Sequence, residues 1–122
     1  IAHSDGDAVM HAVTDSVFAA IGAEDLGTQF PNSDPQHEAQ DSTEFLQAAL
    51  TQARDGNWTI CNVSITVICD YPKLSAHNHD IARSLESLIG STVHIKGKST
   101  EETRQVEAIE VHAVTLVQRE ST

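Results

Sequence analysis

Apolar residues near the start of the chain recur at intervals of three and four, the repeat of an amphipathic helix. The stripe that they form consists of Val9, Met10, Val13, Val17, Ala20 and Ile21. Ser4 and Asp7 have the spacing of a capping box, so the pattern predicts a helix that begins near Asp5. Gly22 follows the last apolar residue and is expected to end this helix.

Two later segments have the same helical repeat. The first begins around residues 41–44, and the second is closed by Gly90. Their apolar positions are Phe45, Leu46, Ala49 and Leu50 in the first, and Ile81, Leu85, Leu88 and Ile89 in the second. Residues 26–42 are rich in Pro, Asn, Asp and Ser and predict a long loop, a kind of segment that often binds or covers a ligand.

Three segments have the pattern of strands, and residues 55–57 have that of a turn. Residues 58–69 alternate, with the more apolar face formed by Cys61, Val63, Ile65, Val67 and Cys69. Residues 92–98 and 106–118 predict two more strands. The order α, α, β, α, β, β over residues 1–122 predicts a single α+β domain, a two-layer sandwich with helices on one face of a mixed sheet. The other sheet face mixes small and polar residues and could pack against copies of itself.

The charge balance restricts the partners. The chain has 122 residues with 7 Lys and Arg against 18 Asp and Glu, a net charge of −11. Nucleic acid and anionic membrane surfaces require basic patches, so neither is expected as a partner, and we find neither a membrane span nor a signal peptide. Cys61 and Cys69 lie too far apart along one strand to bond, which predicts reduced thiols in a cytoplasmic or organellar protein.

The first predicted helix also carries a chemical pattern. His3, Asp7, His11 and Asp15 are four residues apart, so they share one side of a helix. A neighbouring carboxylate orients an imidazole and raises its basicity, as a metal-binding histidine requires. His3 and Ser4 lie at the expected N-terminus, where free N–H groups favour phosphate. The alternative is ordinary helix-dipole chemistry with His11 as a structural side chain.

Two lysine-bearing segments follow predicted strands. In residues 96–102, Lys98, Ser99 and Thr100 could hold phosphate and Glu101 a divalent ion, although a polar turn has the same composition. Lys73 follows the first strand, where ligands often bind, or is simply solvated. The histidine-rich start of the third helix is assigned no chemistry.

The segment "AHSDGDAVMHAVTDSVFAAIGAEDLGTQFPNSDP" resembles the signature of the 2-C-methyl-D-erythritol 2,4-cyclodiphosphate synthase family of the non-mevalonate isoprenoid pathway. The resemblance extends through "NVSITVICDYPKL" and, more loosely, "VHIKGKSTEE", and covers nearly the whole chain. It implies a cytoplasmic or plastid-type enzyme that forms a homotrimer, with the sheets facing each other and the active sites between adjacent subunits.

The reaction that the resemblance implies converts 4-diphosphocytidyl-2-C-methyl-D-erythritol 2-phosphate into the cyclic diphosphate and releases CMP. The 2-phosphate attacks the β-phosphorus. Zinc would polarise the diphosphate, and a second ion, Mg²⁺ or Mn²⁺, would bridge the phosphates.

The resemblance also implies roles for individual residues. His3 and Ser99 match positions that stabilise the transition state, and His11 and Glu101 match ligands of zinc and of the second metal. The remaining matches are to substrate-binding positions. Ser4 pairs with His3 as a phosphate contact, and Asp15 matches the carboxylate close behind the zinc histidine. Asp25, Gly27, Phe30 and Asp34 match the methylerythritol-side loop, and Cys69, Lys73, Leu74, Gly97 and Lys98 match the surroundings of the cytidine.

The chain departs from the family pattern in three places. Two zinc ligands of the family come from an Asp-x-His on a first strand, which the sequence lacks, so we expect an N-terminal segment to be missing. Lys98 and Ser99 replace the usual threonines, and "STEETRQVEA" is shorter than the family's glycine-rich turn. These departures leave two alternative functions. The chain could be a catalytically inactive trimeric relative that binds a nucleotide or phosphate, or it could be a metal-dependent phosphohydrolase.

Overall fold

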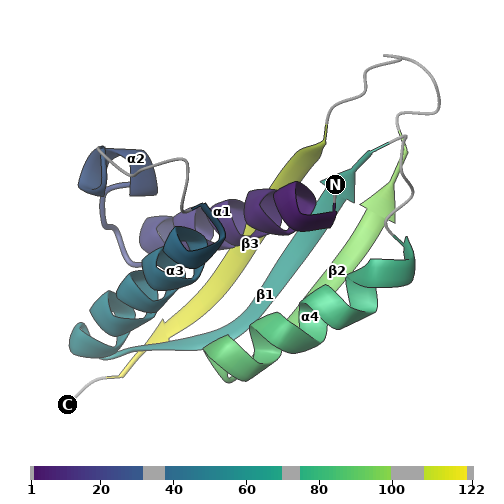
Figure 1. The fold of residues 1–122 in the computed structure, drawn as a ribbon. Coiled ribbons are helices and arrows are strands. Elements are labelled where there is room, and N and C mark those ends of the chain that lie inside the picture. Colours follow the sequence, from purple (N-terminus) through teal and green to yellow (C-terminus); the bar gives the residue numbers. More distant parts are fainter. Residues whose placement is uncertain (1, 32–37, 70–74, 100–108, 121–122) are drawn as a thin grey trace.

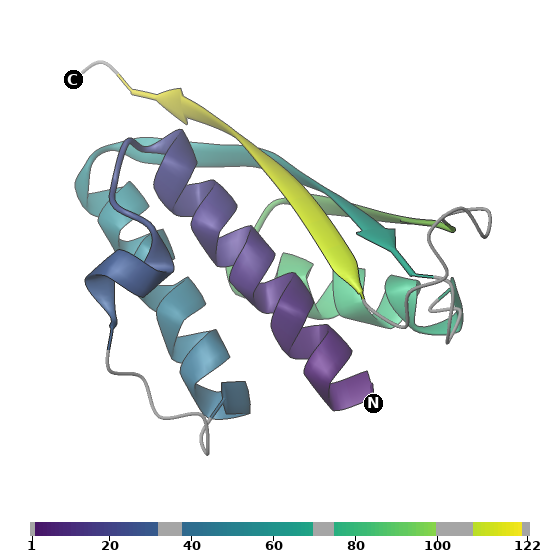
Figure 2. The ribbon, with the colours of Figure 1, turned by 90° about the horizontal axis from the view of Figure 1, so that it is seen from above.

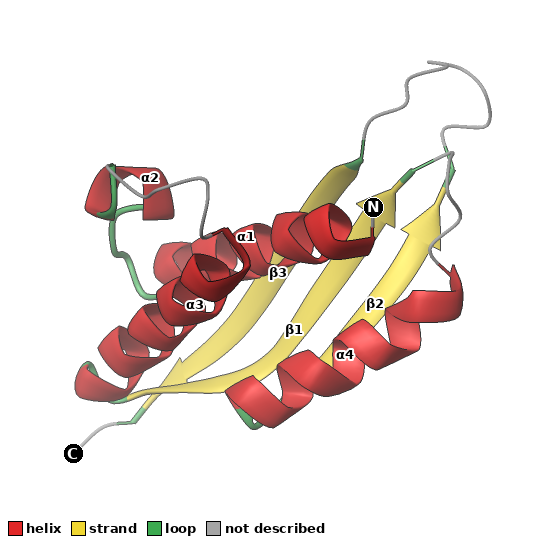
Figure 3. Cartoon of the chain, in the orientation of Figure 1, coloured by secondary structure: helices red, strands yellow, loops and turns green. Residues whose placement is uncertain are grey.

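The computed structural model of the chain describes residues 2–31, 38–69, 75–99 and 109–120. Within these ranges it has four helices and three strands (Figures 1 and 3). They are α1 (Ala2–Ala20), α2 (Leu26–Gln29), α3 (Glu38–Asp55), β1 (Trp58–Ile68), α4 (Ser75–Ile89), β2 (Thr92–Lys98) and β3 (Glu110–Arg119). The predicted α+β class is confirmed.

The described strands form one mixed sheet in the order β2-β1-β3. β2 is parallel to β1 and is reached through α4, whereas β3 is antiparallel to β1. The register of β1 against β3 shifts between Ile60 and Asn62, so Cys61 is the extra residue of a bulge. The bulge changes the phase of alternation along β1. Val63, Ile65 and Val67 are buried, as the sequence pattern predicts, whereas Cys61, which the pattern placed on the same face, is only partly buried. Cys61 and Cys69 form no disulfide with each other.

All the helices lie on one face of the sheet, as Figure 2 shows from above. The predicted stripe of α1 supplies the centre of the core, because Val9, Val13 and Val17 are fully buried. Val9 and Val13 pack in one cluster with Leu46 of α3, Leu85 of α4 and the inward residues of β1. A second cluster around Phe18 and Phe45 joins α1, α2 and α3. This arrangement is the predicted two-layer sandwich.

Element boundaries differ from the sequence predictions where local signals were weak. α1 begins at Ala2 rather than near Asp5, and α3 begins at Glu38, inside the segment predicted as loop. The same segment contains α2, a single turn capped by Asp25. The predicted helix ends are confirmed, because Gly22 and Gly90 have φ of 75° and 80°, a region that glycine enters without steric cost.

The sheet face opposite the helices is open in this chain. The register places Thr92, Asn62 and Leu116 in one row across it, and His94, Ser64 and Val114 in the next. Val114 and Leu116 are 69% and 55% exposed, which is unusual for large apolar side chains in a sheet. The face is therefore polar on β2 and apolar along part of β3.

Candidate active site

His11 lies on the outer part of α1, where its exposed imidazole meets the edge of Phe45 from α3. The two ring centres are 6.4 Å apart and the rings are inclined by 67°. Phe45 also contacts Phe30, at 4.7 Å between ring centres. The aromatic contacts thus join His11, which the resemblance matches to a zinc ligand, and Phe30, which it matches to the methylerythritol side of the substrate.

The two carboxylates that flank His11 have different environments. Asp15 is exposed, and its Oδ1 accepts a hydrogen bond of 2.8 Å from the backbone N–H of Leu26. This bond ties the start of α2 to α1. Asp7 is partly buried, and its Oδ2 has no hydrogen-bond partner among the residues that the structure describes.

The single turn of α2 is built by the residues that the signature segment supplies. Asp25 is the N-cap, and its Oδ1 accepts the backbone N–H of Thr28 at 2.8 Å. Hydrogen bonds from the side chain and then the backbone of Thr28 lower the pKa of Asp25, because they stabilise the carboxylate. The backbone N–H of Phe30 donates a hydrogen bond of 2.8 Å to the carbonyl of Leu26 and completes the turn. Gly27, inside the turn, is exposed. Asp15, Asp25, Gly27 and Phe30 are therefore brought together.

A second group of predicted residues meets where β1 and β2 end. The backbone N–H of Cys69 donates to the carbonyl of Lys98 at 3.0 Å. Gly97, Lys98 and Ser99 are exposed beside it. Figures 1 and 2 show that the ends of β1 and β2 lie at the opposite end of the molecule from α2. A single copy of the described chain therefore keeps the α2 group and the strand-end group apart.

Several predicted site residues fall outside what the structure describes. His3 and Ser4 are in the first turn of α1, but only their backbone is described. Asp34, Lys73, Leu74 and Glu101 lie entirely outside the described residues. Within the described ranges, no three His, Cys, Asp or Glu side chains form a group that could hold a metal ion.

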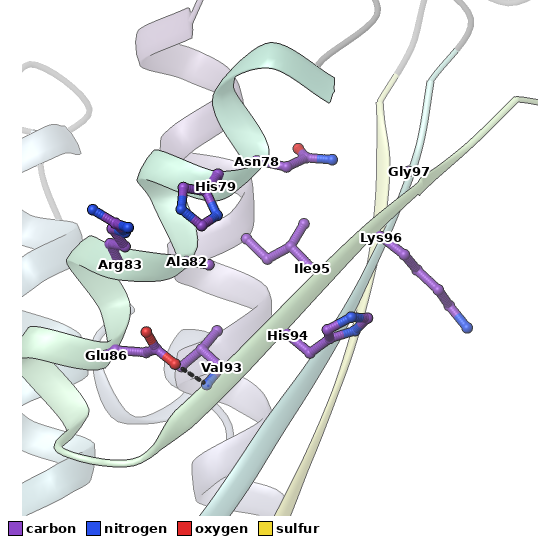
Figure 4. A pocket seen from close by; sticks show the side chains of 10 residues that line it. All are labelled: Asn78, His79, Ala82, Arg83, Glu86, Val93, His94, Ile95, Lys96 and Gly97. Carbon is purple, nitrogen blue, oxygen red and sulfur yellow. Dashed lines mark hydrogen bonds between the residues drawn. The ribbon is translucent and has the colours of Figure 1, made fainter.

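An open groove of about 630 Å³ between α4 and β2 was not anticipated (Figure 4). Asn78, Ala82 and Glu86 line it from α4, and their spacing of four in the sequence could have indicated a shared side of the helix. Glu86 Oε2 accepts the N–H of Val93 at 3.0 Å and so satisfies part of the β2 edge. Figure 4 shows Arg83 and Lys96 pointing to opposite sides, so they do not form one anion site.

The model of the YgbB family matches residues 1–118. The chain belongs to the YgbB family. Proteins named 2-C-methyl-D-erythritol 2,4-cyclodiphosphate synthase are similar over 98% of the chain. The one from Geotalea daltonii is 37% identical and is covered over 73% of its own length; the one from Alkalilimnicola ehrlichii is 40% identical and is covered over 76%.

Solved structures of YgbB-type proteins have the same fold. A 2C-methyl-D-erythritol-2,4-cyclodiphosphate synthase in its CDP-bound form matches with a TM-score of 0.81 and 31% identity, over 97% of this chain and 80% of that one. The CDP complex of Plasmodium falciparum IspF matches with a TM-score of 0.79 and 31% identity, over 96% and 73%. No helix in the described part of this family member is long and apolar enough to cross a membrane.

Proposed function

We propose that the chain forms the product named by its relatives, 2-C-methyl-D-erythritol 2,4-cyclodiphosphate. In the reaction that the sequence resemblance implies, 4-diphosphocytidyl-2-C-methyl-D-erythritol 2-phosphate is cyclised to this product with release of CMP. The observation that carries the proposal is the match, over nearly the whole chain, to a synthase with CDP bound. Both groups of site residues present in the chain fit such a substrate, because one has the sugar-side residues of the signature and the other the nucleotide-side residues.

On the nucleotide side, we assign the cytidine diphosphate to the end of β1 and β2. The backbone bond between Cys69 and Lys98 holds the two strand ends together, and the Lys98 ammonium is exposed for a phosphate. Ser99 carries a hydroxyl that can donate to the charge that develops on the transferred phosphoryl group. The lysine and the hydroxyl supply positioning and charge neutralisation, which is what phosphoryl transfer requires of a protein.

On the sugar side, α2 would orient the methylerythritol. Asp15 and Asp25 hold the turn through the N–H groups of Leu26 and Thr28, so Gly27 and Phe30 are presented at fixed positions. His3 and Ser4 lie in the first turn of α1, where backbone N–H groups have no partner within the helix, which suits the attacking 2-phosphate.

We propose zinc and a second divalent ion, Mg²⁺ or Mn²⁺, as cofactors. The exposed imidazole of His11 fits one position of a zinc site, since imidazole is a common zinc ligand. Glu101 would contact the second ion, and the further zinc ligands would come from outside the described residues. When bound, the ions polarise the diphosphate and neutralise its charge.

A homotrimer would bring the two groups of residues together across subunit boundaries. The separation of α2 from the strand ends within one chain and the exposed Val114 and Leu116 both support this assembly. Analytical ultracentrifugation is expected to give a trimer mass, and Leu116→Asp is expected to give monomers. Leu88→Asp on α4, where the side chain is also partly exposed, is the matched control and should remain trimeric. A wild-type monomer at micromolar concentration contradicts the proposed assembly.

The activity is tested by incubating the purified protein with the substrate, Mg²⁺ and Zn²⁺, and following CMP by chromatography and the cyclic diphosphate by ³¹P NMR. We expect both products in equal amounts. His11→Gln is expected to abolish turnover, and His79→Gln, the same change at an exposed histidine of α4, is the matched control.

The two alternative functions give different results in this assay. CDP binding without release of CMP identifies an inactive binding protein. Release of CMP or phosphate with only open-chain products identifies a phosphohydrolase. Either result contradicts the proposed cyclisation.

A further inference from the structure

Two glutamine side chains link the end of α2 to the last turn of α3. Gln52 Nε2 donates a hydrogen bond of 2.8 Å to Gln29 Oε1, and Gln29 Nε2 donates one of 2.6 Å to the backbone carbonyl of Glu24. Both glutamines are partly buried. This pair of bonds, which we call the glutamine relay, runs from α3 through the last residue of α2 to the segment that precedes its first residue.

The two bonds of the relay determine which atom each amide presents. A side-chain amide accepts through its oxygen and donates through its nitrogen. The carbonyl of Glu24 can only accept, so Gln29 presents its nitrogen there and turns its oxygen to Gln52. Gln52 must then supply a donor. Position 52 therefore requires a side chain that donates a hydrogen bond, and a polar side chain that only accepts would not serve.

α2 depends on contacts of this kind, because a single helical turn is not stable by itself in water. Its first residue is held by the bond from the N–H of Leu26 to α1 and by burial of the Leu26 side chain. At the other end Gln29 is the last residue of the turn, and the ring of Phe30 follows it and packs against α3. The relay adds a hydrogen bond from α3 at this second end.

We propose that Gln52 is a positioning residue for the sugar side of the substrate site. By holding Gln29 it fixes the C-terminal end of α2, and with it the places of Gly27 and Phe30, which the proposed function assigns to the methylerythritol. Gln52 acts through Gln29 rather than by contact with the substrate. This inference rests on the proposed function, whereas the relay and its effect on α2 do not depend on it.

The size of the effect follows from the chemistry of the bond. A hydrogen bond between two uncharged groups contributes a factor of about 2 to 10 to an equilibrium constant. Loss of the relay should therefore raise the population in which the end of α2 is detached by about that factor. A substrate that requires the docked α2 then binds less tightly. Once bound, the substrate itself holds α2, so KM should rise more than kcat changes.

Amide hydrogen exchange without substrate or metal tests the relay. Gln52→Met keeps a long side chain that favours a helix but removes the donor. The Phe30 amide, which closes the turn on the carbonyl of Leu26 at 2.8 Å, should exchange about 2- to 10-fold faster. Gln52→Lys supplies a donor and should restore protection, whereas Gln52→Glu has none and should not. Gln47→Met, the same change at an exposed glutamine of α3, is the matched control and should exchange as the wild type does.

A double-mutant cycle separates an effect through Gln29 from a general effect on α3. Gln29→Met removes both bonds of the relay, so adding Gln52→Met should cause no further increase in exchange at Phe30. A further increase as large as that of Gln52→Met alone overturns the proposal. Unchanged exchange at Phe30 in Gln52→Met also overturns it. Should Gln52→Met fail to fold, the comparison of Gln52→Lys with Gln52→Glu provides the same test.

Steady-state kinetics of the full-length protein with the cytidine diphosphate substrate test the functional role. We expect Gln52→Met to raise KM by about 2- to 10-fold with a smaller change in kcat, Gln52→Lys to return KM toward the wild-type value, and Gln47→Met to leave it unchanged. If the wild type releases no CMP, the proposed function fails while hydrogen exchange still decides whether Gln52 holds α2. Faster exchange in Gln52→Met with an unchanged KM shows that the relay only stabilises the fold, and the positioning role is then wrong.

Discussion

Replacing Asp15 by alanine should loosen α2 without unfolding the domain. The substitution removes the acceptor of the 2.8 Å bond from the Leu26 N–H, the link from the side chain of Asp15 to the start of α2. A side-chain cap on a backbone N–H contributes about 0.5–2 kcal/mol. The negative charge of the Asp15 carboxylate strengthens the bond, whereas the exposure of its side chain to water weakens it. We therefore expect Asp15→Ala to destabilise the docking of α2 on α1 by about 1–2 kcal/mol.

A loss of that size corresponds to an increase of about 5- to 30-fold in the population of the open form. Amide hydrogen exchange measures it directly: the Leu26 amide should exchange faster by that factor in Asp15→Ala. Asp15→Asn keeps a carbonyl acceptor and should show a smaller change. The Ala23 amide, bound to the carbonyl of Phe18 at 2.9 Å, should exchange as in the wild type. Unchanged exchange at Leu26 in Asp15→Ala would refute the assignment of Asp15 as the anchor of α2.

Two further predictions concern the cap of α2 and the core. The lowered pKa of Asp25 means that its carboxylate stabilises α2 above the pKa that this group has in the unfolded chain, and that this contribution is lost as the pH falls through the lower, folded-state pKa. In an NMR titration the chemical shift of the Thr28 amide should therefore change with a midpoint below the usual aspartate pKa. Asp25→Asn should show no such transition. A midpoint at or above the usual aspartate pKa contradicts the cap. Phe18→Ala empties a fully buried site between α1 and α3 and should lower the free energy of unfolding in urea by about 3–5 kcal/mol, against about 0.5 kcal/mol for Leu88→Ala at a partly exposed position.

The hydrophobic pattern was sufficient to predict which segments become helices and strands, because the repeats of 3.6 and 2 reflect burial of one side of each element. The valine stripe of α1 and the strands β1 and β2 were predicted on this basis. α2 was not predicted, because a single capped turn is too short to have a periodicity. The bulge at Cys61 was not predicted either, since an extra residue in one strand is defined only by its partner strand.

The candidate site divides in the same way. The residue types and their spacing were sufficient to identify His11, the two carboxylates beside it and the signature loop as functional candidates. In the sequence Asp7 and Asp15 are equivalent, each one helical turn from His11. The tertiary structure distinguishes them, because α2 folds back onto α1 and brings the N–H of Leu26 to Asp15, while Oδ2 of Asp7 is buried without a hydrogen-bond partner in the described part of the chain. Such contacts depend on segments that are distant in the sequence, and a local pattern contains no information about which of two like carboxylates they will engage.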